Sequence, residues 1–406
     1  MNLAVIGSGG REHALCYKLK QSKEIKKIYC IPGNAGTKNL AENINEDISD
    51  FDKIYQIVLD KKIDYVVVGP EEPLVNGIID FFSEKKIKIF GPTKFASQLE
   101  GSKAFMKNLC KENSIPTAKF GIFENLEKAY DFIKKSKLPI VVKADGLAAG
   151  KGVSICKTKD EAEKKIKEII EGKFKSSKKV ILEEFIEGEE LSYFSVVDEN
   201  TFHFFGSAQD HKRVGEGDVG LNTGGMGAFS PANILDNKLE EKIKKKIIEP
   251  TLNFLKKEGH PYKGFLYTGL MVKENEPYLI EYNIRMGDPE CQVLMMRLKT
   301  NLFDIIKSVI NNTLKNIRIQ WNDECCMTIV LCSKGYPEKY KKDIEIENLN
   351  KIISDNNNQI FHAGTYERNK KIFSNGGRVL NITSLSENLS RTRDKCLETL
   401  KKLDWK

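Results

Sequence analysis

The residues best suited to chemistry lie in a short stretch around position 283. If residues 278–285 form a strand, the alternation of side chains places Glu281, Asn283 and Arg285 on one face. The opposite face would carry Ile280, Tyr282 and Ile284 and would pack into a core. A carboxylate and an amide oxygen two residues apart suit Mg²⁺, which prefers oxygen ligands and keeps positions for water and nucleotide phosphates. Arg285 could hold an anionic substrate or a developing charge, and a half-exposed strand with a surface ion pair is the alternative.

A second candidate lies in a glycine-rich segment that follows an apolar, strand-like run. That run delivers Lys143, and the loop after it carries Gly146, Gly150, Lys151 and Gly152. Glycine and alanine let backbone amides approach a phosphate closely, and the two lysines supply positive charge. The loop is not a Walker A motif, because Lys151 is followed by glycine rather than by serine or threonine. A glycine-rich hairpin with solvated lysines is the alternative.

A third candidate is the turn at residues 7–13, which follows the first strand-like run and opens a helix. Backbone N–H groups and the positive end of the helix dipole could bind an anion there. The turn is similar to a dinucleotide-binding fingerprint, but Glu12 stands at the third glycine position. The second strand-like run also ends at Pro32 without the acid that would bind a ribose. We therefore expect a phosphate cradle, with an NAD site as the alternative.

Acidic residues gather between Glu183 and Glu190, where an apolar run turns into the next element. Backbone amides at such a hinge could read an adenine edge, and a carboxylate could bind ribose hydroxyls; acids exposed beside a glycine turn are the alternative.

Residues 209–227 carry six glycines among their last thirteen positions, and we expect a long loop without regular structure. Its dense charged start favours a function over disorder.

The elements that must position these residues follow a simple order. Over residues 1–100, strand-like runs at 3–6, 28–31, 65–68 and 87–90 alternate with helical runs, which predicts a parallel sheet with helices on its faces. Ligands of such sheets collect at the carboxyl ends of the strands. Ser102 could cap a helix that runs to about Glu112, and Pro116 marks the start of a new lobe. Helices at 160–172 and 239–257 and a strand at 264–272 are predicted next. Residues 326–406 read as a small α+β domain with a closing helix from about Leu389.

Composition describes an ordinary globular protein. The chain has 406 residues, enough for about two to four domains, and a formal net charge of +8. Basic residues are not clustered with aromatic ones, so nucleic acid is not expected as a partner. No apolar run approaches the ~18 residues of a membrane span, and the N-terminus lacks a signal-peptide pattern, so we expect a cytoplasmic protein. A monomer is a separate expectation. The nine cysteines are scattered and read as reduced thiols, and the five histidines do not suggest a zinc site.

Taken together and in order, these motifs resemble the ATP-grasp enzymes, and more closely the phosphoribosylamine–glycine ligases (glycinamide ribonucleotide synthetases) of purine biosynthesis. The resemblance covers nearly the whole chain. It rests on segments 7–13, 32–37, 69–74, 99–103, 143–153, 183–190, 209–213, 222–227, 281–290, 362–365 and 375–378. The implied fold is multidomain α/β and α+β: an N-terminal Rossmann-like domain over 1–100, a two-lobed ATP-grasp core over 101–325 and a small C-terminal α+β domain over 326–406. A mobile lid lobe is implied at about 118–190.

The resemblance also implies a role for each site residue. ATP would be bound by Lys103, Lys143, Gly146, Gly150, Lys151, Gly152, Glu183, Glu184, Phe185, Ile186 and Glu190. The substrates would be bound by Gly9, Gly10, Arg11, Glu12, Asp210, Lys212, Asn222, Thr223, Gly224, Gly225, Arg285, Gly287 and Asp288. Glu281 and Asn283 would hold Mg²⁺, or Mn²⁺ in its place, and Arg285, Lys143 and Asp210 would be catalytic.

The implied reaction is an ATP-dependent amide synthesis. The substrates are glycine and 5-phosphoribosylamine, the intermediate is glycyl phosphate, and the products are glycinamide ribonucleotide, ADP and phosphate. Positioning and charge neutralisation would dominate the catalysis. The alternatives are another ATP-grasp ligase or carboxylase of purine metabolism, a catalytically silent nucleotide-binding regulator, and an NAD-dependent dehydrogenase. The dehydrogenase would explain only the first domain.

Overall fold

The N-terminal part forms a five-stranded parallel sheet, as predicted from its alternating runs. The computed structural model describes residues 1–147, 152–172, 178–217, 219–352, 354–403 and 405. The strand order is β3-β2-β1-β4-β5, with β1 parallel to both β2 and β4. The strands are β1 (Asn2–Gly7), β2 (Lys27–Pro32), β3 (Glu42–Asn43), β4 (Tyr65–Val68) and β5 (Ile89–Phe90). The helices are α1 (Gly10–Leu19), η1 (Thr37–Asn39), α2 (Phe51–Asp60), α3 (Glu71–Asn76) and α4 (Ile78–Glu84).

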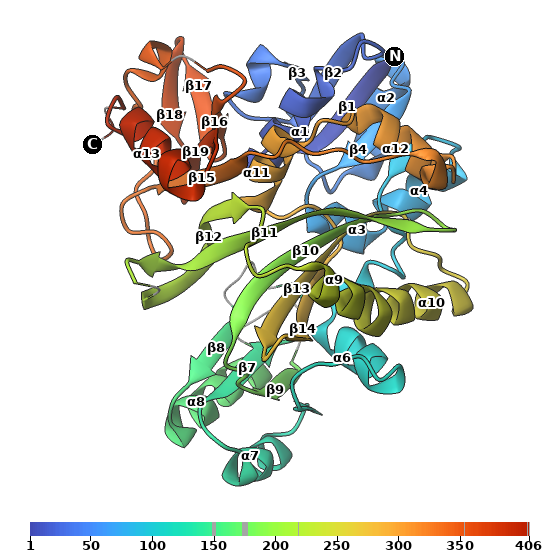
Figure 1. Ribbon diagram of the computed structural model, residues 1–406, viewed down its shortest axis with the longest axis vertical. Coiled ribbons are helices and arrows are strands. Elements are labelled where there is room, and N and C mark those ends of the chain that lie inside the picture. The colour runs from blue at the N-terminus through green and yellow to red at the C-terminus, as the bar shows by residue number, and fades with distance from the viewer. Residues whose placement is uncertain (148–151, 173–177, 218, 353, 404, 406) are drawn as a thin grey trace.

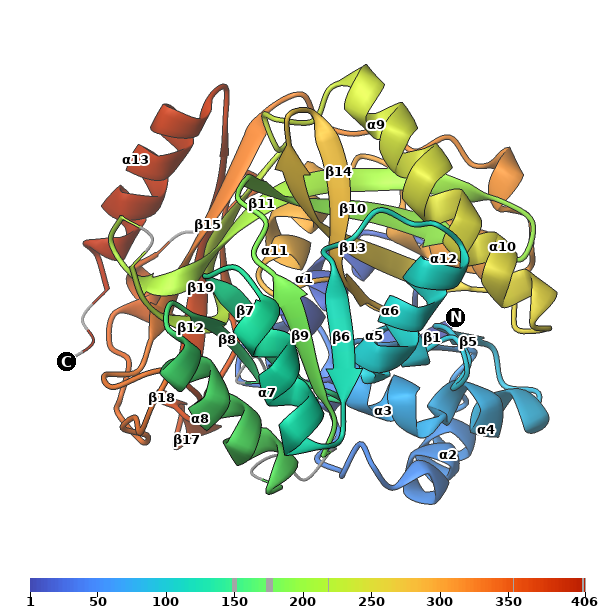
Figure 2. The ribbon, with the colours of Figure 1, turned by 90° about the horizontal axis from the view of Figure 1, so that it is seen from below.

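A smaller lobe follows Pro116 and consists of a four-stranded antiparallel sheet with two helices. The strand order is β6-β9-β7-β8, and every neighbouring pair is antiparallel. Its elements are β6 (Phe120–Phe123), α7 (Leu126–Lys135), β7 (Ile140–Ala144), β8 (Val153–Cys156), α8 (Lys159–Ile170) and β9 (Val180–Glu184). Apolar side chains of both helices pack on this sheet and give the lobe its own core. Figure 2 shows α7 and α8 side by side on the outer face of the sheet.

An eight-stranded sheet runs through the centre of the molecule, in the order β14-β13-β10-β11-β12-β15-β19-β16. Its strands are β10 (Glu189–Val197), β11 (Phe202–Gly215), β12 (Val219–Ser230), β13 (Gly264–Lys273), β14 (Glu276–Asn283), β15 (Cys325–Cys332), β16 (Asn358–His362) and β19 (Arg378–Ser386). Because β12 pairs with β15, the C-terminal strands continue the sheet that carries β14. Figure 1 shows this continuity from the green strands to the orange and red ones.

Helices and a short ribbon surround the central sheet. They are α5 (Gln98–Gly101), α6 (Lys103–Glu112), α9 (Asn237–Ile243), the π-helical turn η2 (Lys244–Ile248), α10 (Glu249–Lys257), α11 (Glu290–Arg297), α12 (Leu302–Ile310), η3 (Leu314–Asn316), η4 (Leu349–Lys351), α13 (Leu389–Leu400), and the ribbon strands β17 (Thr365–Arg368) and β18 (Lys371–Ser374). Ser102 caps α6 as predicted, because its hydroxyl accepts from the Phe105 N–H at 3.1 Å. None of the helices in the described ranges combines the length and apolar character that a bilayer crossing requires.

The prediction of an irregular loop over residues 209–227 was wrong. The segment is a long β-hairpin made by β11 and β12, with Gln209 paired to Phe229 and Arg213 paired to Asn222. The glycines serve the hairpin: Gly217 and Gly220 take positive φ near its tip, and the ladder shifts register twice. Counting glycines as loop formers therefore missed a twisted ribbon.

The predicted strand over residues 278–285 was also displaced by two residues, since β14 spans Glu276–Asn283. β14 ends at Asn283, and Arg285 lies in the bend that follows. A register shift opposite Gly269 and Leu270 leaves Ile280 between the paired residues Leu279 and Glu281. Because this bulge interrupts the alternation, Ile280 is half-buried and lines a cleft instead of entering the core with Tyr282.

Candidate active site

A cleft of about 520 Å³ separates the small lobe from the central sheet, a volume typical of small-molecule sites. The predicted site residues that line it are Arg11, Lys103, Lys143, Gly152, Glu183, Glu184, Phe185, Ile186, Glu190, Asp210, Lys212, Asn222, Thr223, Gly224, Glu281, Asn283, Arg285, Gly287 and Asp288. The predicted residues that do not line it are Gly9, Gly10, Glu12, Gly146 and Gly225. Gly150 and Lys151 lie outside the described residues.

Lys143 enters the cleft from β7 and is held by a buried carboxylate. Its Nζ lies 2.9 Å from Oε1 of Glu183 on β9 and donates to the carbonyl of Ile280 at 3.4 Å. The other oxygen of Glu183 lies 3.0 Å from Nζ of Lys107, a fully buried residue of α6. Burial alone would raise the pKa of Glu183, but the two lysines lower it. Glu183 therefore acts as the anion that orients Lys143, and both of its oxygens are engaged.

Lys107 was missed by the sequence reasoning. It lies on α6 among buried neighbours, and it also donates to Oγ1 of Thr117 at 2.6 Å. Burial lowers its pKa, and the carboxylate of Glu183 opposes that effect. The one signal in the sequence was that Lys107 lies on the apolar face of a predicted helix, where a buried lysine needs an acidic partner.

Lys103 occupies the first turn of α6, next to the cap at Ser102. Its Nζ donates to the carbonyl of Gly146 at 3.0 Å, at the start of the glycine-rich loop. Burial lowers the pKa of Lys103, whereas the carboxylate of Glu281 raises it. Lys103 and Lys143 thus bring two cations from different elements to the same cleft.

The part of the cleft near the hinge after β9 is largely apolar. The contributing side chains are Met106, Ala118, Val141, Ile155, Phe185, Ile186, Met271 and Ile280. Such a lining suits a flat heterocycle, because apolar walls bury a ring while a few polar groups fix its orientation. At the far side of the hinge, the carboxylate of Glu190 lies 3.1 Å from Nζ of Lys212.

Lys212 is the centre of an acidic cluster. Besides Glu190, its Nζ lies 3.8 Å from Asp210 and 3.9 Å from Glu281. Burial would lower the pKa of Lys212, but Asp210 and its other neighbours raise it well above its usual value. Burial raises the pKa of Asp210 and of Glu290, the latter to about 7. Glu290 was given no role from the sequence, although it lines the cleft.

Glu281 and Asn283 both line the cleft from the end of β14, as the alternation of a strand requires. Burial would raise the pKa of Glu281, but Lys212, Lys143 and Lys103 lower it and keep the carboxylate ionised. Within the described ranges, no cluster of three or more His, Cys, Asp or Glu side chains is placed to hold a metal ion. Glu281 and Asn283 offer one carboxylate and one amide oxygen to the cleft.

Arg285 is clamped between two acids that come from the N-terminal half of the chain. Its Nε lies 3.1 Å from Glu71 and its Nη2 lies 2.7 Å from Glu100, which also accepts from the Ile284 N–H. Burial would raise the pKa of Glu71, but Arg285 and Arg11 lower it to about 2. Burial dominates at Glu100 and raises its pKa to about 7. Both acids belong to motifs at residues 69–74 and 99–103, but their contacts with Arg285 were not predicted, because these contacts arise only through the fold.

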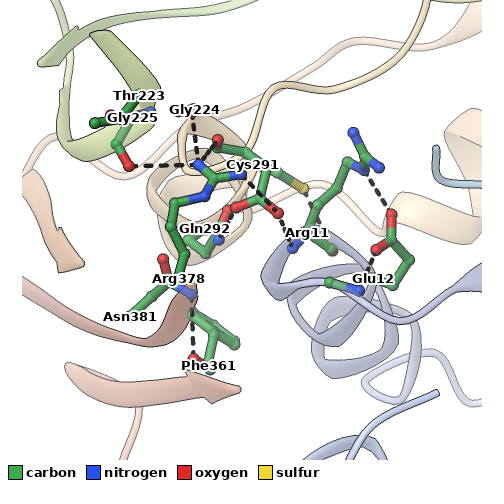
Figure 3. Close-up of polar contacts among 12 residues, drawn as sticks. Arg11, Glu12, Thr223, Gly224, Gly225, Cys291, Gln292, Phe361, Arg378 and Asn381 are labelled. Carbon is green, nitrogen blue, oxygen red and sulfur yellow. Dashed lines mark hydrogen bonds and ion pairs between the residues drawn. The ribbon is translucent and has the colours of Figure 1, made fainter. Parts of the chain in front are cut away.

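The predicted phosphate cradle is closed by carboxylates of the chain itself. The Gly9 N–H donates to Oε2 of Glu12 at 2.6 Å, and the Arg11 N–H donates to Oδ2 of Asp288 at 3.4 Å. Gly10 packs so closely on Gln292 that an added Cβ would lie 2.5 Å from its Nε2. Figure 3 shows Arg11 and Glu12 on one side of this region and Arg378 on the other. Arg378 belongs to the motif at residues 375–378 but was given no role from the sequence, and it lines the cleft from β19.

These features define the class of the protein. A small antiparallel sheet and a larger antiparallel sheet enclose a nucleotide-sized cleft that contains lysines and acids from both sides, which is the architecture of an ATP-grasp enzyme. Models of the phosphoribosylglycinamide synthetase family match residues 1–100 (N domain), 101–291 (ATP-grasp domain) and 326–406 (C domain). The chain belongs to the phosphoribosylglycinamide synthetase family.

Individual relatives agree with this assignment. The chain is 45% identical to a phosphoribosylamine–glycine ligase of Mesorhizobium japonicum and 44% identical to that of Brucella melitensis, covering all of this chain and 95% of each relative. A crystal structure of phosphoribosylamine–glycine ligase from Thermotoga maritima superposes with a TM-score of 0.86 at 33% identity, covering all of this chain and 98% of that one. The biotin carboxylase domain of a Hydrogenobacter thermophilus 2-oxoglutarate carboxylase shares the fold, with a TM-score of 0.77 at 16% identity. The superposition covers all of this chain and 90% of that one.

Proposed function

We propose that the enzyme joins glycine to 5-phosphoribosylamine in an ATP-dependent reaction that yields glycinamide ribonucleotide, ADP and phosphate. The observation that carries the proposal is one cleft that combines Lys143, Glu281, Asn283 and Arg285, in a chain whose full-length relatives are phosphoribosylamine–glycine ligases. The named reaction needs a nucleotide site and an amine site that open into each other, and a single cleft satisfies this need. A cytoplasmic location and a monomeric state stay predictions.

In this proposal, ATP lies between the small lobe and β14. Lys103 and Lys143 contact its phosphates, and the apolar lining near Phe185 receives adenine. Since the Glu183 carboxylate is held by two lysines, adenine is read by backbone groups at residues 184–186. Glu190 receives the ribose hydroxyls and exchanges its contact with Lys212 for them. Gly152 lines the same cleft and is assigned to the phosphates.

Glu281 and Asn283 are suited to Mg²⁺ or Mn²⁺. Both side chains offer oxygen atoms to the cleft, and the lysines around Glu281 keep it ionised. A divalent ion with few protein ligands retains positions for water and nucleotide phosphates. When bound, the ion would neutralise charge on the phosphates during transfer.

The amine side of the cleft is assigned to the second half of the reaction. The glycine carboxylate first attacks the γ-phosphate of ATP, which gives glycyl phosphate and ADP. The nitrogen of 5-phosphoribosylamine then attacks the glycyl carbonyl, the C–O bond to phosphate breaks, and the nitrogen loses a proton. Asp210, Lys212 and Arg11 line this part of the cleft together with residues 222–224 and 287–288, and they hold the two substrates. Arg285 stabilises the charge that develops. Closure of the lobes over the acyl phosphate keeps water out.

The proposal is tested by a coupled assay of ADP release. The purified enzyme is given ATP, Mg²⁺, glycine and freshly prepared 5-phosphoribosylamine, and each component is omitted in turn. We expect ADP release to need all four and the product to have the mass of glycinamide ribonucleotide. ADP release that ignores glycine or 5-phosphoribosylamine would overturn this assignment and leave only the ATP-grasp class.

A further inference from the structure

Arg378 reaches the cleft from the C-terminal part of the chain. It is the first residue of β19, in the segment matched by the C domain model and outside the ATP-grasp match. Arg378 pairs with Cys332, next to a register shift in the β15–β19 ladder. The side chain of Arg378 is 22% exposed. Arg378 lines the cleft, and Figure 3 shows its guanidinium pointing away from its strand toward Gly224 and Gly225.

One nitrogen of this guanidinium bonds to two segments that are distant in sequence. Nη1 of Arg378 donates to the carbonyl of Gly224 at 2.6 Å and to that of Gly225 at 3.4 Å. The same nitrogen donates to the carbonyl oxygen of Asp288. Nη2 lies 3.8 Å from the Asp288 carboxylate. Arg378 thus joins the β11–β12 hairpin to the turn that precedes α11.

The hairpin residues are shaped for this contact. An added Cβ on Gly224 would lie 3.0 Å from Cζ of Arg378, so the guanidinium packs directly on a bare backbone. The Gly224 N–H donates to the hydroxyl of Tyr336 at 3.1 Å, which gives this peptide a second C-terminal partner. Gly225 has a φ of +113°, and its N–H donates to Oγ1 of Thr223 at 3.0 Å. The N–H and the carbonyl of Gly224 are therefore both held by residues outside the hairpin.

Asp288 extends the connection to the N-terminal sheet. Its carboxylate accepts from the Arg11 N–H at the start of α1 and from Nε2 of Gln292 at 2.8 Å. Burial would raise the pKa of Asp288, but Arg378 and Arg11 lower it, so the group stays ionised. The three segments that Arg378 unites directly or through Asp288 are the ones assigned above to the amine substrate.

We propose that Arg378 is a positioning residue of the amine half of the cleft, which holds residues 223–225 against Asp288 in the geometry that receives 5-phosphoribosylamine. This inference rests on the proposed function. Arginine suits the task because its planar, delocalised guanidinium presents several donors in fixed directions, which the single ammonium of lysine cannot reproduce. The ATP half of the cleft does not depend on this contact, since Lys143 and Glu183 are held by each other.

The test compares Arg378→Lys with Arg368→Lys, a matched control in the same C-terminal part. Arg368 is exposed and its Cζ lies 4.5 Å from the centroid of the Phe373 ring. For Arg378→Lys we expect the KM for 5-phosphoribosylamine to rise about tenfold or more, which corresponds to ~1.4 kcal/mol. The dissociation constant of Mg-ATP, measured by equilibrium binding, should stay within about twofold, because Lys143 and Glu183 hold each other without any contact to Arg378. The control should match the wild type in both measurements.

A second variant keeps the inference testable if Arg378→Lys does not fold. Tyr336→Phe removes only the hydroxyl that accepts from the Gly224 N–H, and it should raise the same KM by a smaller factor. An unchanged KM for 5-phosphoribosylamine in a folded Arg378→Lys would overturn the inference, as would equal weakening of amine and ATP binding. If Arg378→Lys is unfolded, an unchanged KM in Tyr336→Phe would overturn it. Wild-type enzyme that releases ADP without 5-phosphoribosylamine would instead refute the proposed function.

Discussion

Replacing Lys107 by methionine removes one of the two cations that flank the Glu183 carboxylate. Lys107 is fully buried, and its Nζ lies 3.0 Å from Glu183, which is itself 2% exposed. Methionine fills similar volume without charge. The change therefore removes the charge of Lys107 together with its hydrogen bond to Thr117, from a buried network that also fixes Lys143 at 2.9 Å.

The loss of unfolding free energy depends on which charged groups remain buried without a partner after each substitution. Removing one partner of a buried ion pair usually costs about 3–5 kcal/mol. Lys107→Met should cost about 3 kcal/mol, because Glu183 retains Lys143. Glu183→Gln should cost about 5 kcal/mol, because it leaves two buried lysines without an anion. The double variant should be more stable than Glu183→Gln alone, since methionine then removes a charge that has no partner.

The assay is urea unfolding at equilibrium, followed by circular dichroism and extrapolated to water. Lys134→Met serves as the control, because Lys134 forms an exposed 3.2 Å pair with Asp131 in the same lobe as Glu183. Losing this exposed ion pair should lower the unfolding free energy by no more than about 1 kcal/mol. The reasoning is refuted if Lys107→Met costs no more than this control. It is also refuted if the cost of Lys107→Met adds in full to that of Glu183→Gln.

Three further predictions concern a buried acid, a glycine and the metal site. Burial raises the pKa of Glu100 from 4.5 to about 7, so its stabilising contribution is present below pH 4.5 and is lost as the pH rises through 7. Relative to Glu100→Gln, the wild type should lose about 3 kcal/mol of unfolding free energy across that interval, and a constant difference would contradict this. Gly225→Ala should lower Tm more than Gly259→Ala in calorimetry, because both have positive φ but only the first Cβ would meet an atom, Pro289 Cδ at 2.6 Å; equal shifts would argue against it. Glu281→Gln should abolish Mg²⁺-dependent ADP release while the circular dichroism spectrum stays native, because it removes the carboxylate proposed to hold the ion; ordinary Mg²⁺ dependence would show that the metal assignment is wrong.

Local patterns were sufficient where an element is specified by its own residues. The apolar run Tyr65–Val68 was predicted with the bounds that β4 has, because all four residues are buried in a parallel sheet. Ser102 was predicted as a cap because its hydroxyl bonds within one turn of α6. Glu281 and Asn283 were placed together because residues two apart share a strand face.

The missed features depend on partners that are far away in sequence. Glu71 and Glu100 reach Arg285 across more than 180 positions, and no local pattern specifies such a pairing. Arg378 lies 154 positions from Gly224, which it contacts only because the C-terminal strands continue the central sheet. A glycine count could not reveal the β11–β12 hairpin, since cross-strand pairing decides whether a glycine lies in a loop or a ladder.

The charge balance of the cleft explains why a divalent cation belongs in the proposed reaction. Among the described lining residues, six basic side chains face nine acidic ones, a formal excess of three negative charges. Most of the basic groups are engaged by acids of the chain, which preorganises them but weakens their attraction for phosphates. Protons on Glu100 and Glu290, whose pKa values are both raised to about 7, remove part of the excess near neutral pH. The remainder still opposes a triphosphate, so nucleotide binding should depend on the charge that a metal at Glu281 and Asn283 would bring.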